Sequence, residues 1–322
     1  MHLKLSTFIL AILILLPECE AQYEAWEHSG SLYIVTTPEG AGLPAGVIEH
    51  NFPLLIRLDR DFFDFRQAGP EGSDIRFSAG GAPLAYQIEQ WNPQEGTAHI
   101  WVRIPIIKGN EQQLIKMHWG NPNVASEGHS ESVFRVEDGF AGVWHLNDTL
   151  EDATSNNLDG FNKPDKPTTN SRGIIGDAQD FGANKLLVIR PPGVAADRRV
   201  TCMPSGNADR TMSAWVKPTS FEGLNWASAS IGGWGEPERG VKPNMGLSYM
   251  TITGIGQPRF HLYGFDPRCE NELSSGEWRH IALSVSDDMV RFYVDGVLKN
   301  TVDNSGALVN NCLLYTSPSP RD

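Results

Sequence analysis

The chain has 322 residues, of which 40% are hydrophobic and 20% are charged, and its formal net charge is −13. This length allows about two domains, and the apolar content can fill ordinary cores, which excludes a wholly disordered chain. The acidic balance disfavours nucleic acid as a partner, because proteins that bind a phosphate backbone need a basic surface. The 32 glycines and 21 prolines favour many short strands over long helices.

Residues 1–21 have the features of a secretory signal peptide. Lys4 precedes the apolar run Leu5–Leu16, and the small residues Cys19 and Ala21 stand three places and one place before the expected cleavage site. The run is too short to span about 30 Å of hydrocarbon. We expect an extracytoplasmic protein, secreted or periplasmic, after cleavage near Ala21. The alternative is a lipid anchor on Cys19, which the bulky Glu18 before it disfavours.

Alternation of apolar and polar residues dominates the remaining sequence and predicts half-buried strands. We predict strands at Leu54–Leu58, Ala98–Ile104, Leu114–Trp119, Met212–Val216, Phe260–Leu262, Arg279–Val285 and Val290–Val294. Leu54–Leu58 is apolar on both faces, which is typical of a central strand. Asp295-Gly296 predicts a two-residue hairpin turn. Since no segment carries a helical apolar stripe, the predicted fold class is all-β, with two β-sandwich domains.

A change of composition near residues 134–143 predicts the border between the two domains. Compact strand patterns precede it, and the polar stretch Asp148–Arg172, which follows it, predicts a surface loop. We therefore expect one β domain over residues 22–138 and a second over residues 139–311.

The last eleven residues, Cys312–Asp322, match the translation of a sequencing-library transposase adapter residue for residue. We interpret residues 312–322 as read-through and exclude them from the fold. The alternative is a genuine polar tail. On the first interpretation the reading frame is truncated near Asn311.

These segments carry two family resemblances. The first half resembles the domain of unknown function DUF2341 at Phe52–Leu58, Asp74–Phe77, Leu84–Ile88, Ile100–Pro105 and Met117–Asn121. The second half resembles a LamG-like jelly roll of the concanavalin A-like lectin/glucanase superfamily at Val143–Leu146, Leu158–Gly160, Gly173–Ala178, Ser213–Val216, Trp278–Ala282 and Phe292–Gly296. Jelly rolls of this type continue past the Asp-Gly hairpin into further strands. The resemblance therefore implies that this one is incomplete at its C-terminus.

Catalytic motifs are missing from the sequence. Glucanases of this fold need carboxylates two residues apart on one strand, as in Glu-x-Asp-x-x-Glu. Glu270 and Glu272 have that spacing but lie in loop-like sequence without a third acid. No Gly-x-Ser-x-Gly elbow, His-Glu-x-x-His motif or phosphate-binding loop occurs. We therefore expect a protein that is not an enzyme.

Calcium is the one cofactor that the residues suggest. Five oxygen-bearing side chains fall close together in the polar stretch, and calcium takes six to eight oxygen ligands from flexible loops. They are Asn147, Asp148, Asp152, Asn157 and Asp159. The alternative is a solvated loop, because Asp and Asn are also good turn formers.

Two cysteines, Cys202 and Cys269, remain between the signal peptide and the adapter-like segment. Export permits a disulfide between them, and two buried free thiols are the alternative.

Sugar binding uses aromatic faces flanked by polar groups. Trp226 and Trp234 lie in loop-like sequence, with Arg239 and Asn244 nearby as hydrogen-bond donors, whereas Trp144, Trp215 and Trp278 lie in strand motifs that predict core positions. The favoured hypothesis is an exported non-catalytic protein whose jelly roll binds a carbohydrate or another cell-surface ligand.

Two alternatives stay open. One is the periplasmic ectodomain of a MotA/TolQ/ExbB-type proton-channel protein, which the resemblance suggests and which would bring a membrane partner only through a downstream module. The other is a glycoside hydrolase of the glucanase-like fold.

Overall fold

The computed structural model describes residues 21–182, 185, 187–189, 202–204, 208–221, 229–234, 248–261 and 266–305. The chain divides into two compact units, residues 1–129 and 130–322. The domain border predicted at residues 138–139 thus lies inside the second unit, after two short helical elements, α1 (Ser130–Val133) and η4 (Val136–Asp138).

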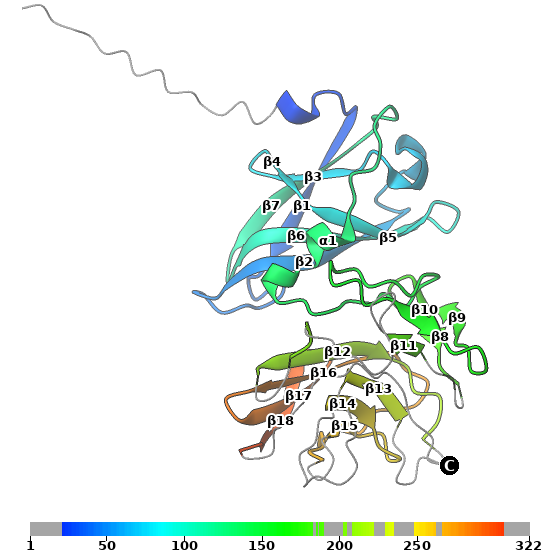
Figure 1. Ribbon diagram of the computed structural model, residues 1–322. Coiled ribbons are helices and arrows are strands. Elements are labelled where there is room, and N and C mark those ends of the chain that lie inside the picture. The colour runs from blue at the N-terminus through cyan, green and yellow to red at the C-terminus, as the bar shows by residue number, and fades with distance from the viewer. Residues whose placement is uncertain are drawn as a thin grey trace, which may run out of the picture. The chain divides into compact units, whose positions relative to one another are not determined.

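The first unit is built from seven antiparallel strands in two sheets (Figure 1). One sheet has the order β1-β7-β3-β4 and the other the order β2-β6-β5. The strands are β1 (His28–Val35), β2 (Ile48–Asp59), β3 (Arg76–Ala79), β4 (Ala82–Leu84), β5 (Tyr86–Asn92), β6 (Thr97–Lys108) and β7 (Gln112–Trp119). Three short 3₁₀ turns accompany them: η1 (Ala21–Tyr23), η2 (Phe65–Gln67) and η3 (Pro70–Gly72).

The two sheets share one core. Alternate residues of β6 face inward, and Ala98, Ile100 and Val102 are fully buried. Phe77 of β3 and Met117 of β7 belong to the same cluster, so both sheets contribute one face to it. This arrangement is a β-sandwich.

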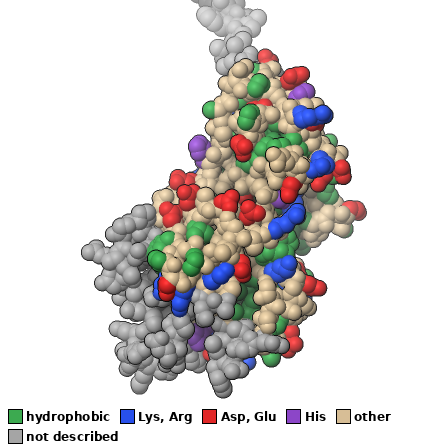
Figure 2. All heavy atoms as spheres, turned by 90° about the vertical axis from the view of Figure 1, so that its right-hand side faces the viewer, with side chains coloured by type: hydrophobic (Ala, Val, Ile, Leu, Met, Phe, Trp, Pro, Cys, Tyr) green, Lys and Arg blue, Asp and Glu red, His purple; other side chains and the backbone are tan. Residues whose placement is uncertain are grey.

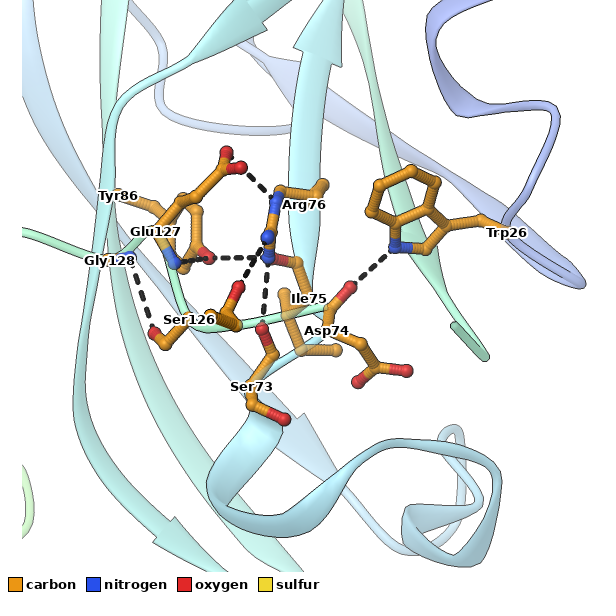
Figure 3. A network of polar contacts seen from close by, with 10 residues as sticks. Trp26, Ser73, Asp74, Ile75, Arg76, Tyr86, Ser126, Glu127 and Gly128 are labelled. Carbon is orange, nitrogen blue, oxygen red and sulfur yellow. Dashed lines mark hydrogen bonds and ion pairs between the residues drawn. The ribbon is translucent and has the colours of Figure 1, made fainter. Parts of the chain in front are cut away.

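Two buried charged residues tie loops to this sandwich. The Arg76 guanidinium donates to the backbone carbonyls of Ser73, Ile75 and Ala125 and to the Tyr86 hydroxyl, and it forms an ion pair with Glu127 at 3.1 Å (Figure 3). The preceding carboxylate, that of Asp74, accepts the backbone N–H groups of three residues. They are Gly69, Gly120 and Asn121, at 2.7, 2.7 and 2.9 Å. Since an unpartnered buried charge is costly, these contacts fix the loops that they reach.

The second unit is also antiparallel β (Figure 1). A four-stranded sheet has the order β12-β16-β17-β18, a three-stranded sheet has the order β13-β14-β15, and two small sheets pair β10 with β9 and β11 with β8. The strands are β8 (Gly160–Asn162), β9 (Thr169–Arg172), β10 (Asp177–Asp180), β11 (Leu187–Ile189), β12 (Arg210–Val216), β13 (Ala229–Trp234), β14 (Ser248–Ile252), β15 (Pro258–His261), β16 (Arg279–Ser286), β17 (Met289–Val294) and β18 (Val297–Asp303).

One core lies between the two larger sheets. Ile281, Leu283 and Phe292 enter it from the four-stranded sheet, and Met250 and Phe260 enter it from the three-stranded sheet. The expected all-β class with two sandwiches is confirmed in both units.

Local patterns predicted seven of the eighteen strands that the structure describes, namely β2, β6, β7, β12, β15, β16 and β17. The predicted hairpin is confirmed, because Val294 pairs with Val297 and the turn residues Asp295 and Gly296 have φ values of 51° and 77°. Leu54–Leu58 belongs to β2, which is an edge strand and not a central one. That prediction was wrong because β6, between β2 and β5, takes the central place.

The polar stretch predicted as a loop contains two short strands, β8 and β9. Strand β9 could not be predicted from alternation, since all four of its residues are exposed. Among the described residues, no helix has the length and apolar character needed to cross a membrane.

Candidate functional site

Of the four residues of the predicted aromatic site, the structure describes Trp234. Trp226, Arg239 and Asn244 lie outside the described residues. Trp234 ends β13, is 5% exposed, and donates its indole N–H to the Pro204 carbonyl at 2.8 Å. Its ring belongs to the core of the second unit, so the expectation that Trp234 offers an exposed stacking face was wrong. The Gly-rich sequence around Trp234 suggested a loop, but Gly232 and Gly233 are part of the strand.

The predicted calcium ligands form a hydrogen-bonded loop. The buried Asp152 carboxylate accepts the backbone N–H groups of Val143, Thr154 and Leu158, at 2.9 to 3.0 Å, and the Thr154 hydroxyl at 2.8 Å. Asp159 accepts the Asp152 backbone N–H.

The other three side chains of the set have separate partners. Asn147 accepts from Thr149, Asp148 accepts from Asn170, and Asn157 donates to the Ser155 carbonyl. Among the described residues, no three His, Cys, Asp or Glu side chains are grouped so that they could hold a metal ion. The five side chains therefore do not converge on a calcium site: the Asn147, Asp148, Asp152 and Asp159 side chains accept hydrogen bonds from separate donors, and Asn157 donates one.

The two cysteines are free thiols in the structure, which is the alternative that the sequence left open. Cys269 is buried in the core of the second unit and Cys202 packs against the same core. Burial raises the pKa of both thiols above the ordinary value, which lowers their reactivity.

An exposed aromatic surface lies on the four-stranded sheet of the second unit. Along β12, Met212 and Val216 face the core, so Trp215 points from the opposite face and is 42% exposed. Its partner across the sheet is His280 of β16, with ring centroids 5.3 Å apart in an edge-to-face arrangement. Burial lowers the pKa of His280, so the neutral imidazole is favoured beside the indole.

A second row of residues extends this surface across the sheet. Ser213 of β12 is opposite Ala282 of β16, which is opposite Tyr293 of β17, and Tyr293 is opposite Leu298 of β18. Leu298 is 50% exposed and Tyr293 is half-buried. We call Ser213, Trp215, His280, Ala282, Tyr293 and Leu298 the outer aromatic face. The small Ser213 and Ala282 leave room between the two aromatic side chains, so a flat ligand could lie against them.

The alternation of residues along β12 indicates that Trp215 is exposed, but the family strand motif that contains it suggested a core position. Trp215 was predicted to be a core residue because it lies in a family strand segment. Alternation along β12 places Met212, Ala214 and Val216 on one side, and therefore Trp215 on the other. Of the other two tryptophans predicted as core, Trp144 packs against the core and Trp278 is half-buried.

Two family models match this chain, and the first match crosses the border between the two units. Residues 71–149 match the family model described as "Domain of unknown function (DUF2341)", and residues 194–315 match that of the "Concanavalin A-like lectin/glucanases superfamily". The chain carries a DUF2341 region followed by a concanavalin A-like region. The predicted order of the two families is thus confirmed. Among proteins of curated function, none is similar in sequence to this chain.

Solved structures with weak similarity include domain 4 of AbnA, an extracellular arabinanase from Geobacillus stearothermophilus, in complex with arabinotriose. It is 20% identical, the match covers 52% of this chain and 75% of that one, and the TM-score is 0.36. The carbohydrate binding module CBM66 from Bacillus subtilis is 10% identical, with 49% and 83% covered and a TM-score of 0.25. A putative carbohydrate binding protein from Bacteroides ovatus is 12% identical, with 83% and 68% covered and a TM-score of 0.28.

The acidic residues with glucanase-like spacing lie apart from the strands of the concanavalin A-like region. Glu270 and Glu272 are exposed in the segment between β15 and β16, and the Glu270 backbone N–H donates to Asn300. A hollow of about 460 Å³ in the same region is lined by Thr219, Ser220, Phe221, Gly254 and Ser275, none of which is titratable in the range of general acid–base catalysis.

On the face seen in Figure 2, acidic and basic side chains of the described residues are interspersed.

Proposed function

We propose that the concanavalin A-like region is a non-catalytic binding module and that a saccharide packs on its outer aromatic face. The observation that carries the proposal is the exposure of Trp215 on an open sheet. An indole face packs well against the C–H face of a sugar ring, and neighbouring polar groups then fix the hydroxyls. Ser213 and the neutral imidazole of His280 are such groups. A single exposed aromatic residue is ordinary, but this one lies beside a second row of the same sheet face, which contains Tyr293 and Leu298.

The test is binding of the chain to a panel of immobilised glycans, before and after Trp215→Ala. We expect the substitution to weaken binding by about tenfold or more, as for an aromatic residue central to an interface. Tyr33→Ala is a matched control, because Tyr33 is also exposed on a strand but lies in the other unit. Equal glycan binding by Trp215→Ala and the unaltered protein would show that the saccharide binds at another site. If the protein binds no glycan at all, the saccharide proposal is wrong.

The non-catalytic part of the proposal has its own test. The exposed loop position of Glu270 and Glu272 supports a binding role, since glycosidases hold two carboxylates at a set distance across the scissile bond. Incubation of the same glycans with the protein should release no reducing ends. Release that disappears on Glu270→Gln or Glu272→Gln would make the chain a glycoside hydrolase instead.

We also propose export, on the sequence features of residues 1–21 alone. Expression in a bacterial host and mass spectrometry of the protein from the extracytoplasmic fraction should give an N-terminus near Gln22. Recovery of the uncleaved chain from the cytoplasm would contradict this.

A further inference from the structure

The three-stranded sheet of the second unit carries a row of polar residues on the face opposite the core. Met250 and Phe260 point into the core, so their strand neighbours Thr251 and Arg259 point to the opposite face, where Thr251 is only 5% exposed. Ser230 of β13 is opposite Thr251, and Thr251 is opposite Arg259. A further β-bridge places Arg268 opposite Arg259. Four chain segments thus present two hydroxyls and two guanidinium groups in one line.

The two arginines form an unfavourable pair by themselves. Residues directly opposite each other in an antiparallel pair share a face, and like charges there are destabilising. Burial is the main cause that lowers the pKa of the Arg259 guanidinium, and the charge of Arg268 lowers it further. Asp266, with its carboxylate 3.9 Å from Arg259 Nη1, raises this pKa by more than Arg268 lowers it. The same carboxylate also contacts the imidazole of His261 at 2.6 Å. Arg268 forms no ion pair with any described residue.

Burial and a hydrogen bond hold the Arg259 side chain of this row in place. The Arg259 side chain is only 12% exposed, and its Nε donates to the Thr251 hydroxyl at 3.2 Å. The Ser230 hydroxyl oxygen is buried and has no hydrogen-bond partner among the described residues. A buried hydroxyl without a partner costs free energy that a bound acceptor would recover. The position of the Arg259 side chain is therefore set before any ligand arrives.

We propose that Arg268, with Arg259 opposite it across the β-bridge, forms a binding site for the carboxylate of an acidic sugar, such as a uronic acid. A guanidinium group presents parallel N–H donors that match the two oxygens of a carboxylate, and a carboxylate between two arginines removes their repulsion. The chain's net charge of −13 disfavours a densely charged polymer, so the ligand carries few acidic groups. The sugar part of this ligand rests on the proposed function, whereas the carboxylate part does not.

Binding of galacturonate, galactose and acetate, measured by saturation-transfer NMR, distinguishes recognition of the carboxylate from recognition of the sugar ring. The protein should bind galacturonate more tightly than galactose. Arg268→Gln should lower the affinity for galacturonate by about tenfold, which is the loss expected for one charge-assisted hydrogen bond. Arg268 is exposed, so the variant should keep the melting temperature of the unaltered protein. Arg268→Lys keeps the charge without the paired donors and should bind with intermediate affinity. Lys217→Gln, an equal charge change at an exposed position after β12, is the control and should change nothing.

The outcomes distinguish the two proposals. If Arg268→Gln binds galacturonate as well as the unaltered protein does, the carboxylate site is wrong even if glycans bind through Trp215. If Trp215→Ala abolishes binding of neutral glycans while galacturonate binding persists, the two sites are independent and both proposals stand. If acetate binds as tightly as galacturonate and no glycan binds, the site takes simple carboxylates and both the acidic-sugar assignment and the proposed function fail.

Discussion

The Nε2 atom of His118 lies 2.9 Å from the hydroxyl oxygen of Ser78, and the two residues are 8% and 3% exposed. They belong to β7 and β3 of the first unit and share the outer face of their sheet, where Tyr23 stacks on the imidazole at 4.3 Å. A serine and a histidine at this distance resemble part of a catalytic group. The cover provided by Tyr23 and the low exposure make the pair a structural contact that holds the N-terminal segment on the sheet.

This pair predicts a pH dependence of stability. Burial, together with the nearby charge of Lys116, lowers the pKa of His118 below its ordinary value. The unfolded chain therefore takes up a proton at a higher pH than the folded protein, and the contribution to stability is full above the unfolded pKa and is lost as the pH falls through it. We expect the free energy of unfolding to decrease between about pH 7.5 and about pH 5.

His118→Gln keeps a hydrogen-bonding group but does not titrate, so it should reduce this decrease. His50→Gln, at an exposed position in the same unit, is the control. Urea unfolding at the two pH values measures the effect. An unchanged pH dependence in His118→Gln would show that other groups cause it.

Asp74→Asn should destabilise the first unit by about 2–4 kcal/mol. The carboxylate accepts three backbone N–H groups from two loops, and an amide would turn a donor toward some of them. Asp64→Asn is the control, because Asp64 is exposed and its contacts are with the neighbouring Arg66, which holds its pKa at about 2. Denaturant unfolding should separate the two variants clearly. Equal effects would mean that the Asp74 contacts contribute little.

Gly296→Ala should destabilise the second unit by about 1 kcal/mol. Gly296 has a φ of 77° in the hairpin between β17 and β18, a conformation that side chains disfavour although nothing lies within 4 Å of the added carbon. Gly232→Ala is the control: an added Cβ also meets nothing within 4 Å there, but φ is not positive. The difference between the two variants therefore measures the cost of the positive φ. Thermal melting of both variants is the measurement. Equal melting temperatures for the two would contradict the assigned turn geometry.

Calcium should leave the melting temperature of the second unit unchanged, and a chelator should not lower it. The Asp152 carboxylate accepts three backbone N–H groups and one hydroxyl, which leaves it no free oxygen for an ion. Asp152→Asn should therefore destabilise by about 2–4 kcal/mol with or without calcium. A rise in melting temperature with calcium that Asp148→Asn abolishes would restore the calcium prediction.

Local sequence determined the class of the fold and many of its strands. Period-two alternation identified the buried face of β6, β12, β16 and β17, and Asp295-Gly296 identified the hairpin. These features depend on residues a few positions apart, so the sequence reports them directly. The prediction that Trp215 is a core residue was wrong, because it followed the strand motif, whereas the alternation along β12 places this side chain on the face opposite Met212 and Val216.

Tertiary structure decided which of these segments meet. Nothing local to β2 reveals that it is an edge strand, and nothing local to Asp74 reveals that it binds Gly120 and Asn121 of a distant loop. Arg259 and Arg268 become neighbours only through a β-bridge, and Trp215 and His280 only through the register of β12 with β16. Both candidate binding surfaces arise from cross-strand pairing, which joins residues by hydrogen-bond register rather than by distance along the chain.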